Sequence, residues 1–328
     1  MRRRDFIKGI AGSATAWPLI AHAQQSAAPV IGLLDIRTPE EMGSRLGGFR
    51  RGLKEAGFVE DENVSIVYRW AENQYDRLPG LAADLVRQRV SVLATTGGPP
   101  AAFAAKAATT TIPIVFLVGS DPAQLGLVTS LSRPTGNLTG VNLFNTEIEP
   151  KRLEFLRTLV PHATRIAVLI NPSDRANAEA TLRDLPPAAT AMGLQIQFYD
   201  AQTPNEIDSV FANLVRESPD AIFFGTSAFM NGRRVQLVQL AAFHRLPAAY
   251  STREAVEIGG LMSYSTDIVD AFRQVGVYVG QVLKGAKTTT LPVVQAEKFG
   301  LAINSRAARL LGLTVPPTML AIADEVIE

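Results

Sequence analysis

The sequence of 328 residues contains no cysteine and only three histidines. The absence of cysteine excludes disulfide bonds, thiolate metal sites, cysteine nucleophiles and a lipid-anchored N-terminal cysteine. The two histidines beyond residue 23, His162 and His244, have no second histidine four residues on, which is the spacing of a zinc site on a helix. We therefore expect no metal site and a fold that is stable without covalent cross-links.

The motifs of the common enzyme classes are also missing. No GxSxG nucleophile elbow, no GxxxxGK[ST] phosphate loop and no GxGxxG dinucleotide fingerprint occurs. Four isolated acids could in principle meet across a cleft as an acid and base pair: Asp35, Asp121, Asp174 and Asp267. The sequence gives no distance between them. Helix capping, or binding of a ligand ammonium group, explains these acids equally well. We assign no catalytic residue and no cofactor.

No apolar run is long enough to cross a bilayer, which needs about 20 residues. The run from Gly9 to Ile20 follows the hexapeptide RRDFIK, which begins at Arg3, and precedes Ala21-His22-Ala23. These are the three parts of a cleavable signal peptide, and the hexapeptide resembles the twin-arginine consensus. We expect residues 1–23 to direct export by the twin-arginine route, cleavage near Ala23 and a periplasmic location.

The mature chain carries little net charge. Removing residues 1–23 takes away four basic residues and one acidic residue, which leaves 28 basic against 30 acidic residues and no basic block. Such a surface has no electrostatic footprint for nucleic acid or for an anionic membrane. We expect a small-molecule ligand, no nucleic acid and no membrane-embedded part.

Short β-branched apolar runs alternate with helical patterns along the whole mature chain. This alternation predicts an α/β fold with parallel sheets built from βαβ units. We expect strands at 30–35, 64–69, 90–95, 112–118 and 138–144, and a second series at 165–170, 195–200, 221–225, 247–250, 261–263 and 299–303. Helices are expected between them, including 150–159, 176–192, 232–244 and 267–283. Two halves of similar size are joined near residues 143–150, and the short joint indicates a hinge.

Hydroxyl-bearing residues and glycines cluster where these strands end. Ligands of open parallel sheets bind outside the carboxyl ends of the strands, near helix N-termini. Each such loop, taken alone, is also explained by ordinary helix caps and turns. Together they favour a cleft for a small polar or aromatic ligand; the candidate residues are Asp35, Thr95, Thr96, Gly97, Gly98, Asp121, Asn171, Thr226, Ser227, Phe229, Tyr250, Tyr264 and Thr266.

Three long stretches resemble a known family. They are IPIVFLVGSDPAQLGLV (112–128), RPTGNLTGVN (133–142) and INSRAARLLGLTVPPTMLAIADEVIE (303–328). The chain from Pro29 onward is similar to periplasmic substrate-binding proteins of ABC transporters, in the subgroup that includes tryptophan and tyrosine binders. Pro134-Thr135-Gly136-Asn137 stands where the familiar pattern has Pro-Gly-Gly-Asn, a small departure in a turn.

The resemblance implies a two-lobed type I periplasmic binding protein, with the chain crossing three times between the lobes. Lobe 1 would hold residues 29–143 and 267–290, lobe 2 residues 147–264 and 295–328, with the ligand between them. By position, Thr95 to Pro100 and Asp121 would contact the ligand from lobe 1. Asn171, Thr226, Ser227, Tyr250 and Tyr264 would do so from lobe 2.

The resemblance also implies a mode of binding and a set of partners. An amino-acid ligand would place its carboxylate at Thr96 to Gly98 and its ammonium at Asp121, with Phe229, Tyr250 or Tyr264 stacking on an aromatic group. The partners would be an ABC permease and its ATPase, and the protein would act as a monomer. An exported α/β enzyme and a ligand-sensing periplasmic receptor domain remain the alternatives.

Overall fold

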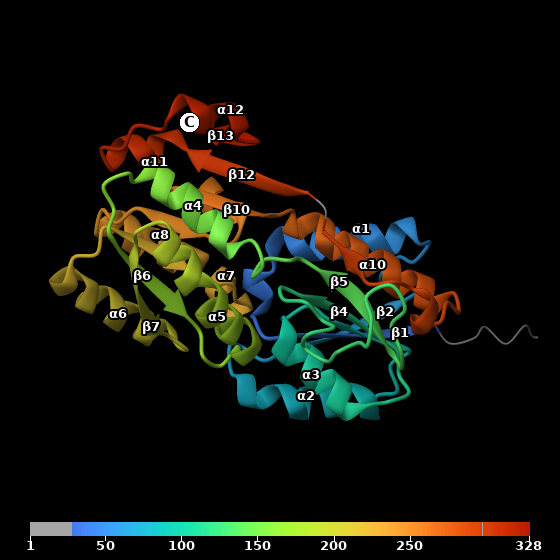
Figure 1. The fold of residues 1–328 in the computed structure, drawn as a ribbon. Helices are drawn as coiled ribbons and strands as arrows, with labels where there is room; N and C mark the ends of the chain where they lie inside the picture. The colour runs from blue at the N-terminus through green and yellow to red at the C-terminus, as the bar shows by residue number, and fades with distance from the viewer. Residues whose placement is uncertain (1–27, 297) are drawn as a thin grey trace, which may run out of the picture.

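The computed structural model describes residues 28–296 and 298–328, so the expected signal peptide lies outside the described residues. The chain forms two α/β lobes that lie side by side (Figure 1). Each lobe is built on its own sheet, and the described strands follow the two expected series closely. The short strands β11 and β13 were not expected from the sequence.

The first lobe contains a six-stranded, all-parallel sheet in the order β11-β5-β4-β3-β1-β2. Its strands are β1 (Val30–Asp35), β2 (Ser65–Trp70), β3 (Val92–Thr95), β4 (Ile114–Val118), β5 (Leu138–Asn142) and β11 (Val294–Gln295). Its helices are α1 (Gly43–Glu55), α2 (Leu78–Arg87), α3 (Pro99–Ala108) and α10 (Ile268–Leu283). Helices α1 and α10 cover one face of the sheet, and α2 and α3 cover the other.

The second lobe contains a seven-stranded sheet in the order β13-β12-β10-β9-β8-β6-β7. Its strands are β6 (Arg165–Ile170), β7 (Gln195–Asp200), β8 (Ala221–Phe224), β9 (Ala248–Tyr250), β10 (Met262–Thr266), β12 (Phe299–Asn304) and β13 (Glu325–Ile327). Strand β12 runs antiparallel to β10, whereas the other pairs are parallel.

Helices cover both faces of the second sheet. The longer ones are α4 (Glu149–Leu159), α5 (Arg175–Ala191), α6 (Pro204–Glu217) and α8 (Arg234–Phe243), and the short ones are α7 (Ala228–Gly232), α9 (Arg253–Glu257), α11 (Ser305–Leu310) and α12 (Pro317–Ile322). The helix expected over 232–244 is present as α8, and the short α7 before it was not expected. Ser227 caps α7, because its hydroxyl accepts a hydrogen bond from the Met230 amide.

The chain passes between the lobes three times: from β5 into α4, from β10 into α10, and between Gln295 and Phe299. It leaves the first sheet after Gln295, somewhat later than the expected boundary at residue 290, because β11 pairs with β5. The first crossing is fixed by Asn145, whose backbone oxygen accepts hydrogen bonds from Arg152 (3.2 Å) and from the Thr226 hydroxyl (3.2 Å).

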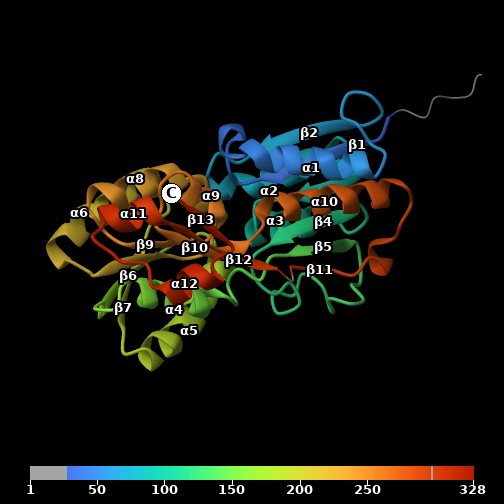
Figure 2. The ribbon, with the colours of Figure 1, turned by 90° about the horizontal axis from the view of Figure 1, so that it is seen from above.

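Helix α10 returns to the first lobe and lies along α1, as both views show (Figures 1 and 2). Glycines make this approach possible. A Cβ atom at Gly52 would overlap the backbone oxygen of Arg273, and one at Gly276 would overlap that of Phe49. Gly48 faces the Val269 backbone oxygen in the same way, and Gly280 faces the Cβ atom of Ala56, so each helix presents a GxxxG stripe to the other. At Gly48, Gly52 and Gly276 the two helix backbones therefore touch without intervening side chains.

Candidate ligand-binding cleft

The carboxyl ends of the two sheets face each other, and the loops that follow these strands meet between the lobes. The Asn171 amide of the second lobe donates a hydrogen bond to the Tyr75 hydroxyl of the first lobe (2.9 Å). The Ser120 hydroxyl of the first lobe donates to Asn177 Oδ1 of the second lobe (2.6 Å). The lobes are therefore in direct contact through a buried layer of polar side chains.

The first-lobe wall of this layer centres on Asp35, at the end of β1. Both of its oxygens are engaged: Arg37 donates from Nε (2.8 Å) and Nη2 (2.6 Å), and the Thr96 hydroxyl donates to Oδ2 (2.6 Å). Burial raises the pKa of the Asp35 carboxyl, but the charge and hydrogen bonds of Arg37 and the hydrogen bond of Thr96 outweigh it, so the pKa lies below its usual value. Asp35 is ionised and fully partnered.

The second-lobe wall centres on Asp174, which directly precedes α5 and is fully buried. Its Oδ2 accepts a hydrogen bond from the Asn177 amide (2.9 Å), while its Oδ1 has no hydrogen-bond partner among the described residues. Burial raises the pKa of the Asp174 carboxyl to about 7. Gly98 of the first lobe lies opposite, since a Cβ atom there would be 3.9 Å from Asp174 Oδ2.

The loop after β8 is held by a buried acid. Glu149 accepts a hydrogen bond from the Thr226 amide through Oε1 (2.8 Å), and burial raises the pKa of the Glu149 carboxyl. Gly119 of the first lobe approaches closely, because a Cβ atom there would lie 3.1 Å from Thr226 Cγ2. This part of the cleft is shaped by the backbone and leaves little room for larger side chains.

Ion pairs join the lobes beside the polar layer. Arg45 on α1 is buried and pairs with Glu254 on α9, and Arg233 pairs with Glu41 (2.5 Å). Partly buried pairs of this kind are hydrogen-bonded and directional, so they fix how the lobes meet. They add contacts that form only when the lobes are together.

An interlobe groove of about 520 Å³ adjoins this layer. The first-lobe side contributes α3 and the loop after β4, and the second-lobe side contributes the first half of α5. Its lining residues are Pro99, Pro100, Phe103, Ser120, Asp121, Gln124, Leu125, Thr146, Glu147, Ser173, Arg175, Ala176, Glu179, Ala180 and Arg183. Phe103 is 39% exposed there, which is unusual for a large apolar side chain and leaves a ring available for contact.

The structure brings part of the expected residue set to the cleft. Asp35, Thr96, Gly98, Asn171, Thr226 and Ser227 lie at the strand ends that face the other lobe. Thr95 is buried at the end of β3, Gly97 packs against the Ile36 amide, and Thr266 hydrogen-bonds to Asn145 at the first crossing (3.4 Å). Asp121 lines the groove and uses Oδ1 to accept a hydrogen bond from the Ala123 amide (2.8 Å).

The three aromatic candidates are packed inside the second lobe. Tyr250 packs against Phe224, and Tyr264 packs against Phe155 and Phe299 on the opposite face of the sheet. Phe229 is fully buried in the cluster that also contains Tyr250. Phe229 and Tyr250 are therefore buried and Tyr264 is partly buried, whereas Phe103 is the more exposed ring, in the lining of the interlobe groove.

The candidate binding residues lack Tyr75, Ser120 and Asn177, which make cross-lobe hydrogen bonds, and the sequence named Asp174 only among the acids that could cap a helix, pair with another acid or bind a ligand ammonium. Ser120 and Asp174 belong to loops that the sequence predicted for the cleft. The partner of Ser120 is distant in sequence, whereas the partner of Asp174 is Asn177, three residues on. Tyr75 comes soon after β2, so the strand-end rule that selected the other loops applies to it as well.

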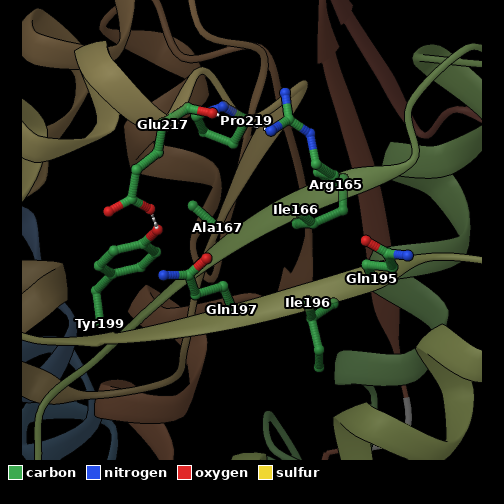
Figure 3. Close-up of a pocket in the computed structure, with 9 residues that line it drawn as sticks. All are labelled: Arg165, Ile166, Ala167, Gln195, Ile196, Gln197, Tyr199, Glu217 and Pro219. Carbon is green, nitrogen blue, oxygen red and sulfur yellow. Dashed lines mark hydrogen bonds between the residues drawn. The ribbon is translucent and has the colours of Figure 1, made fainter.

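A second hollow, of about 390 Å³, lies on the outer part of the second lobe (Figure 3). It is lined by residues of β6 and β7 and by the end of α6, and the Tyr199 hydroxyl donates a hydrogen bond to Glu217. Arg165 donates to the backbone oxygen of Glu217 (3.0 Å). These polar groups satisfy one another away from the strand ends that face the first lobe, so this hollow is a weaker candidate for a ligand site.

The described part of the chain offers neither a metal site nor a membrane-spanning helix. Residues 28–296 and 298–328 contain no group of three or more histidine, aspartate or glutamate side chains placed to hold a metal ion. In the same residues, no helix combines the length and the apolar character needed to span a membrane.

Two lobes, three crossings and a buried polar layer between the sheets define a binding protein of the type I periplasmic fold. The chain belongs to the ABC transporter substrate binding protein family, whose model matches residues 31–327. The expected family and fold class are thus confirmed.

Individual relatives agree with this assignment. A tyrosine-binding protein from Clostridioides difficile is 25% identical over 266 residues, which cover 81% of this chain and 76% of that protein. A structure from Streptococcus pneumoniae in complex with L-Trp superimposes with a TM-score of 0.83 at 27% identity, covering 92% of this chain and all of that one. The structure of a conserved domain protein from Vibrio cholerae superimposes with a TM-score of 0.83 at 26% identity, covering 91% of this chain and 99% of that one. These relatives include binding proteins for small ligands, and none is described as an enzyme.

Proposed function

We propose that this protein is the solute-binding component of an ABC importer, which captures a small polar or aromatic molecule by closure of its two lobes. The observation that carries the proposal is the cross-lobe polar layer, in which the Asn171 amide donates a hydrogen bond to Tyr75 and the Ser120 hydroxyl donates one to Asn177. A ligand that contacts both walls at once shifts the population toward the closed form. A permease can distinguish the closed shape from the open one.

The ligand contacts that we propose are the cleft-facing members of the expected set together with the residues that the structure adds. From the first lobe these are Tyr75, Thr96 and Gly98, and from the second lobe Asn171, Thr226 and Ser227. Similarity to tryptophan- and tyrosine-binding relatives supports an amino acid as ligand. Phe103, rather than Tyr250 or Tyr264, would then contact an aromatic side group in the interlobe groove.

The proposal is tested with the mature protein, residues 24–328. Calorimetric titration with aromatic amino acids is expected to give saturable binding, and small-angle scattering is expected to show a smaller radius of gyration with ligand. Mass spectrometry of material retained after native purification identifies the ligand if these amino acids are not bound. A folded protein that retains no small molecule and gives no heat with amino acids, sugars or purines would contradict the proposal.

We further propose that the protein works in the periplasm, reached by the twin-arginine route, as a monomer that meets an ABC permease and its ATPase. The RRDFIK hexapeptide and the short apolar run support the export route. A reporter fused to residues 1–30 should be exported, and changing Arg3 and Arg4 together to lysine should stop its export. If the double variant is still exported, residues 1–23 would still be a signal peptide, but the twin-arginine route would be excluded.

A further inference from the structure

The carboxylate of Asp174 has hydrogen-bonding capacity that the fold does not use. Its side chain is fully buried, yet Oδ1 has no partner among the described residues. The residue directly precedes α5, but its side chain makes no capping hydrogen bond to the helix. Among the described residues, Asn177 at the start of α5 is the residue that serves this carboxylate: its amide donates to Oδ2 (2.9 Å) and its backbone also lowers the pKa of Asp174. These interactions leave Oδ1 unpartnered.

No cation of the described chain neutralises this carboxylate. The groups that face it are the Tyr75 hydroxyl from the first lobe, the backbone at Gly98 before α3, and the Asn177 amide on α5. The adjacent Arg175 points to solvent, where it pairs with Glu179 (2.7 Å). Arg37 is committed to Asp35 in the first-lobe wall. When the lobes meet, an ionised Asp174 is therefore buried without a countercharge.

Burying an ionised carboxylate without a partner is costly, and a ligand that supplies only hydroxyl groups does not supply the missing charge. An ammonium group supplies both the charge and up to three hydrogen-bond donors. Asp174 is not part of the groove lining, but its chain neighbours Ser173 and Arg175 are, and we place the rest of the ligand in that groove.

We propose, building on the function proposed above, that the ligand carries an ammonium group and that Asp174 Oδ1 binds it. Amino acids are the class that this chemistry and the relatives favour. The same carboxylate resists closure of the empty cleft, because closing without ligand buries its charge. Loading and closing are thereby coupled through one residue: the lobes close readily only when a cation has arrived.

The test compares the wild-type protein with Asp174→Asn, which keeps the side-chain shape and removes the charge. Asp184→Asn, on the same helix but outside the cleft, is the matched control. The probes are L-tryptophan and L-tyrosine, their decarboxylated amines tryptamine and tyramine, their deaminated acids indole-3-propionate and 3-(4-hydroxyphenyl)propionate, and D-glucose. Thermal unfolding confirms that each variant is folded.

Wild-type protein and Asp184→Asn should bind an ammonium-bearing probe, and the deaminated acids should bind at least 100-fold more weakly. Asp174→Asn should lose at least 100-fold in affinity for that probe. Binding of the amines as well as the amino acids would show that the ammonium alone suffices, whereas binding of the amino acids only would add a carboxylate subsite. Affinity retained within threefold in Asp174→Asn would overturn the inference while leaving the proposed function intact, as would wild-type preference for D-glucose.

A second readout needs no ligand. At pH 8 the empty wild-type protein and Asp184→Asn should be more open in small-angle scattering than empty Asp174→Asn, which has no charge to bury on closing. Equal radii of gyration for all three proteins would overturn the coupling. If no probe binds and no compound is retained after purification, the proposed function fails and the ammonium site fails with it; the scattering result then tests only whether Asp174 resists closure of the empty lobes.

Discussion

The two walls of the cleft each bury an acid near the end of their lobe's first strand, but the two acids are used differently. Asp35, after β1, has both oxygens bound by Arg37 and Thr96, and its pKa lies below the usual value. Asp174, after β6, has one oxygen bound and one without a partner among the described residues, and its pKa is raised to about 7. Glu149 also has an unpartnered buried oxygen, but Arg152 lies beside it as a countercharge. Asp174 differs from both Asp35 and Glu149 in that it combines an unpartnered oxygen with the lack of a cationic partner in the described chain.

The largest effect expected from this comparison is the loss of stability when Asp35 is changed. In Asp35→Asn, the buried Arg37 guanidinium loses its countercharge, which typically costs about 3–5 kcal/mol. Urea unfolding followed by circular dichroism measures the loss. Asp174→Asn, which leaves no charge unpaired, should retain wild-type stability or exceed it. Equal losses in the two variants would show that both acids are structural.

A smaller effect is expected from pH on the empty protein. In the closed form the pKa of Asp174 is about 7, against an ordinary value of 3.8 when the open cleft exposes it to water. The closed form therefore binds the proton more tightly and is favoured at low pH. As the pH rises from about 4 through 7, the ratio of closed to open protein should fall by about tenfold per pH unit. Scattering should show the empty protein opening over this window.

The variant Asp174→Asn tests whether Asp174 causes this pH-dependent opening. Glu149 also has a raised pKa, but it lies inside the second lobe against Thr226 and Arg152 and stays there when the lobes separate. The pH-dependent opening should therefore flatten in Asp174→Asn. If the variant opens over the same window as the wild type, another group controls closure.

The smallest change in ligand affinity is expected for Asp121, the acid to which the family resemblance assigned the ligand ammonium group. Its Oδ1 accepts the Ala123 amide and its side chain is only partly buried in the groove. Asp121→Asn keeps an oxygen for that turn, so ligand affinity measured by calorimetry should change by less than about threefold. A loss comparable to that of Asp174→Asn would return the ammonium site to Asp121.

The sequence predicted the fold well because the central strands of both sheets, such as β3, β4 and β8, are wholly buried. Runs such as Ile114–Val118 and Arg165–Ile170 are apolar and β-branched, so their period and length identify them without tertiary information. The terminal strands β11 and β13 are two and three residues long and carry no such pattern. These two strands form because they pair with β5 and β12, and a local sequence pattern carries no information about such partners.

The site was predicted at the level of loops but not of side chains. Tyr264 and Met262 alternate onto one face of β10, so the period of two would have placed Tyr264 in the core. By contrast, the sequence alone does not distinguish Asp174 from Asp121, since both are acids in loops that follow a buried strand. Only the three-dimensional partners of each oxygen separate the two carboxylates, and a local pattern does not contain them.

The glycine-lined contact between α1 and α10 has a consequence for biosynthesis. The first-lobe core combines Ile31, near its start, with Val282 on α10. A ribosome must therefore make most of the chain before this core can be completed, and until then the apolar face of α1 lacks its cover. The first lobe cannot finish folding as an N-terminal unit during translation. Such a chain reaches its native state after release, which is compatible with an export route that carries cargo already folded.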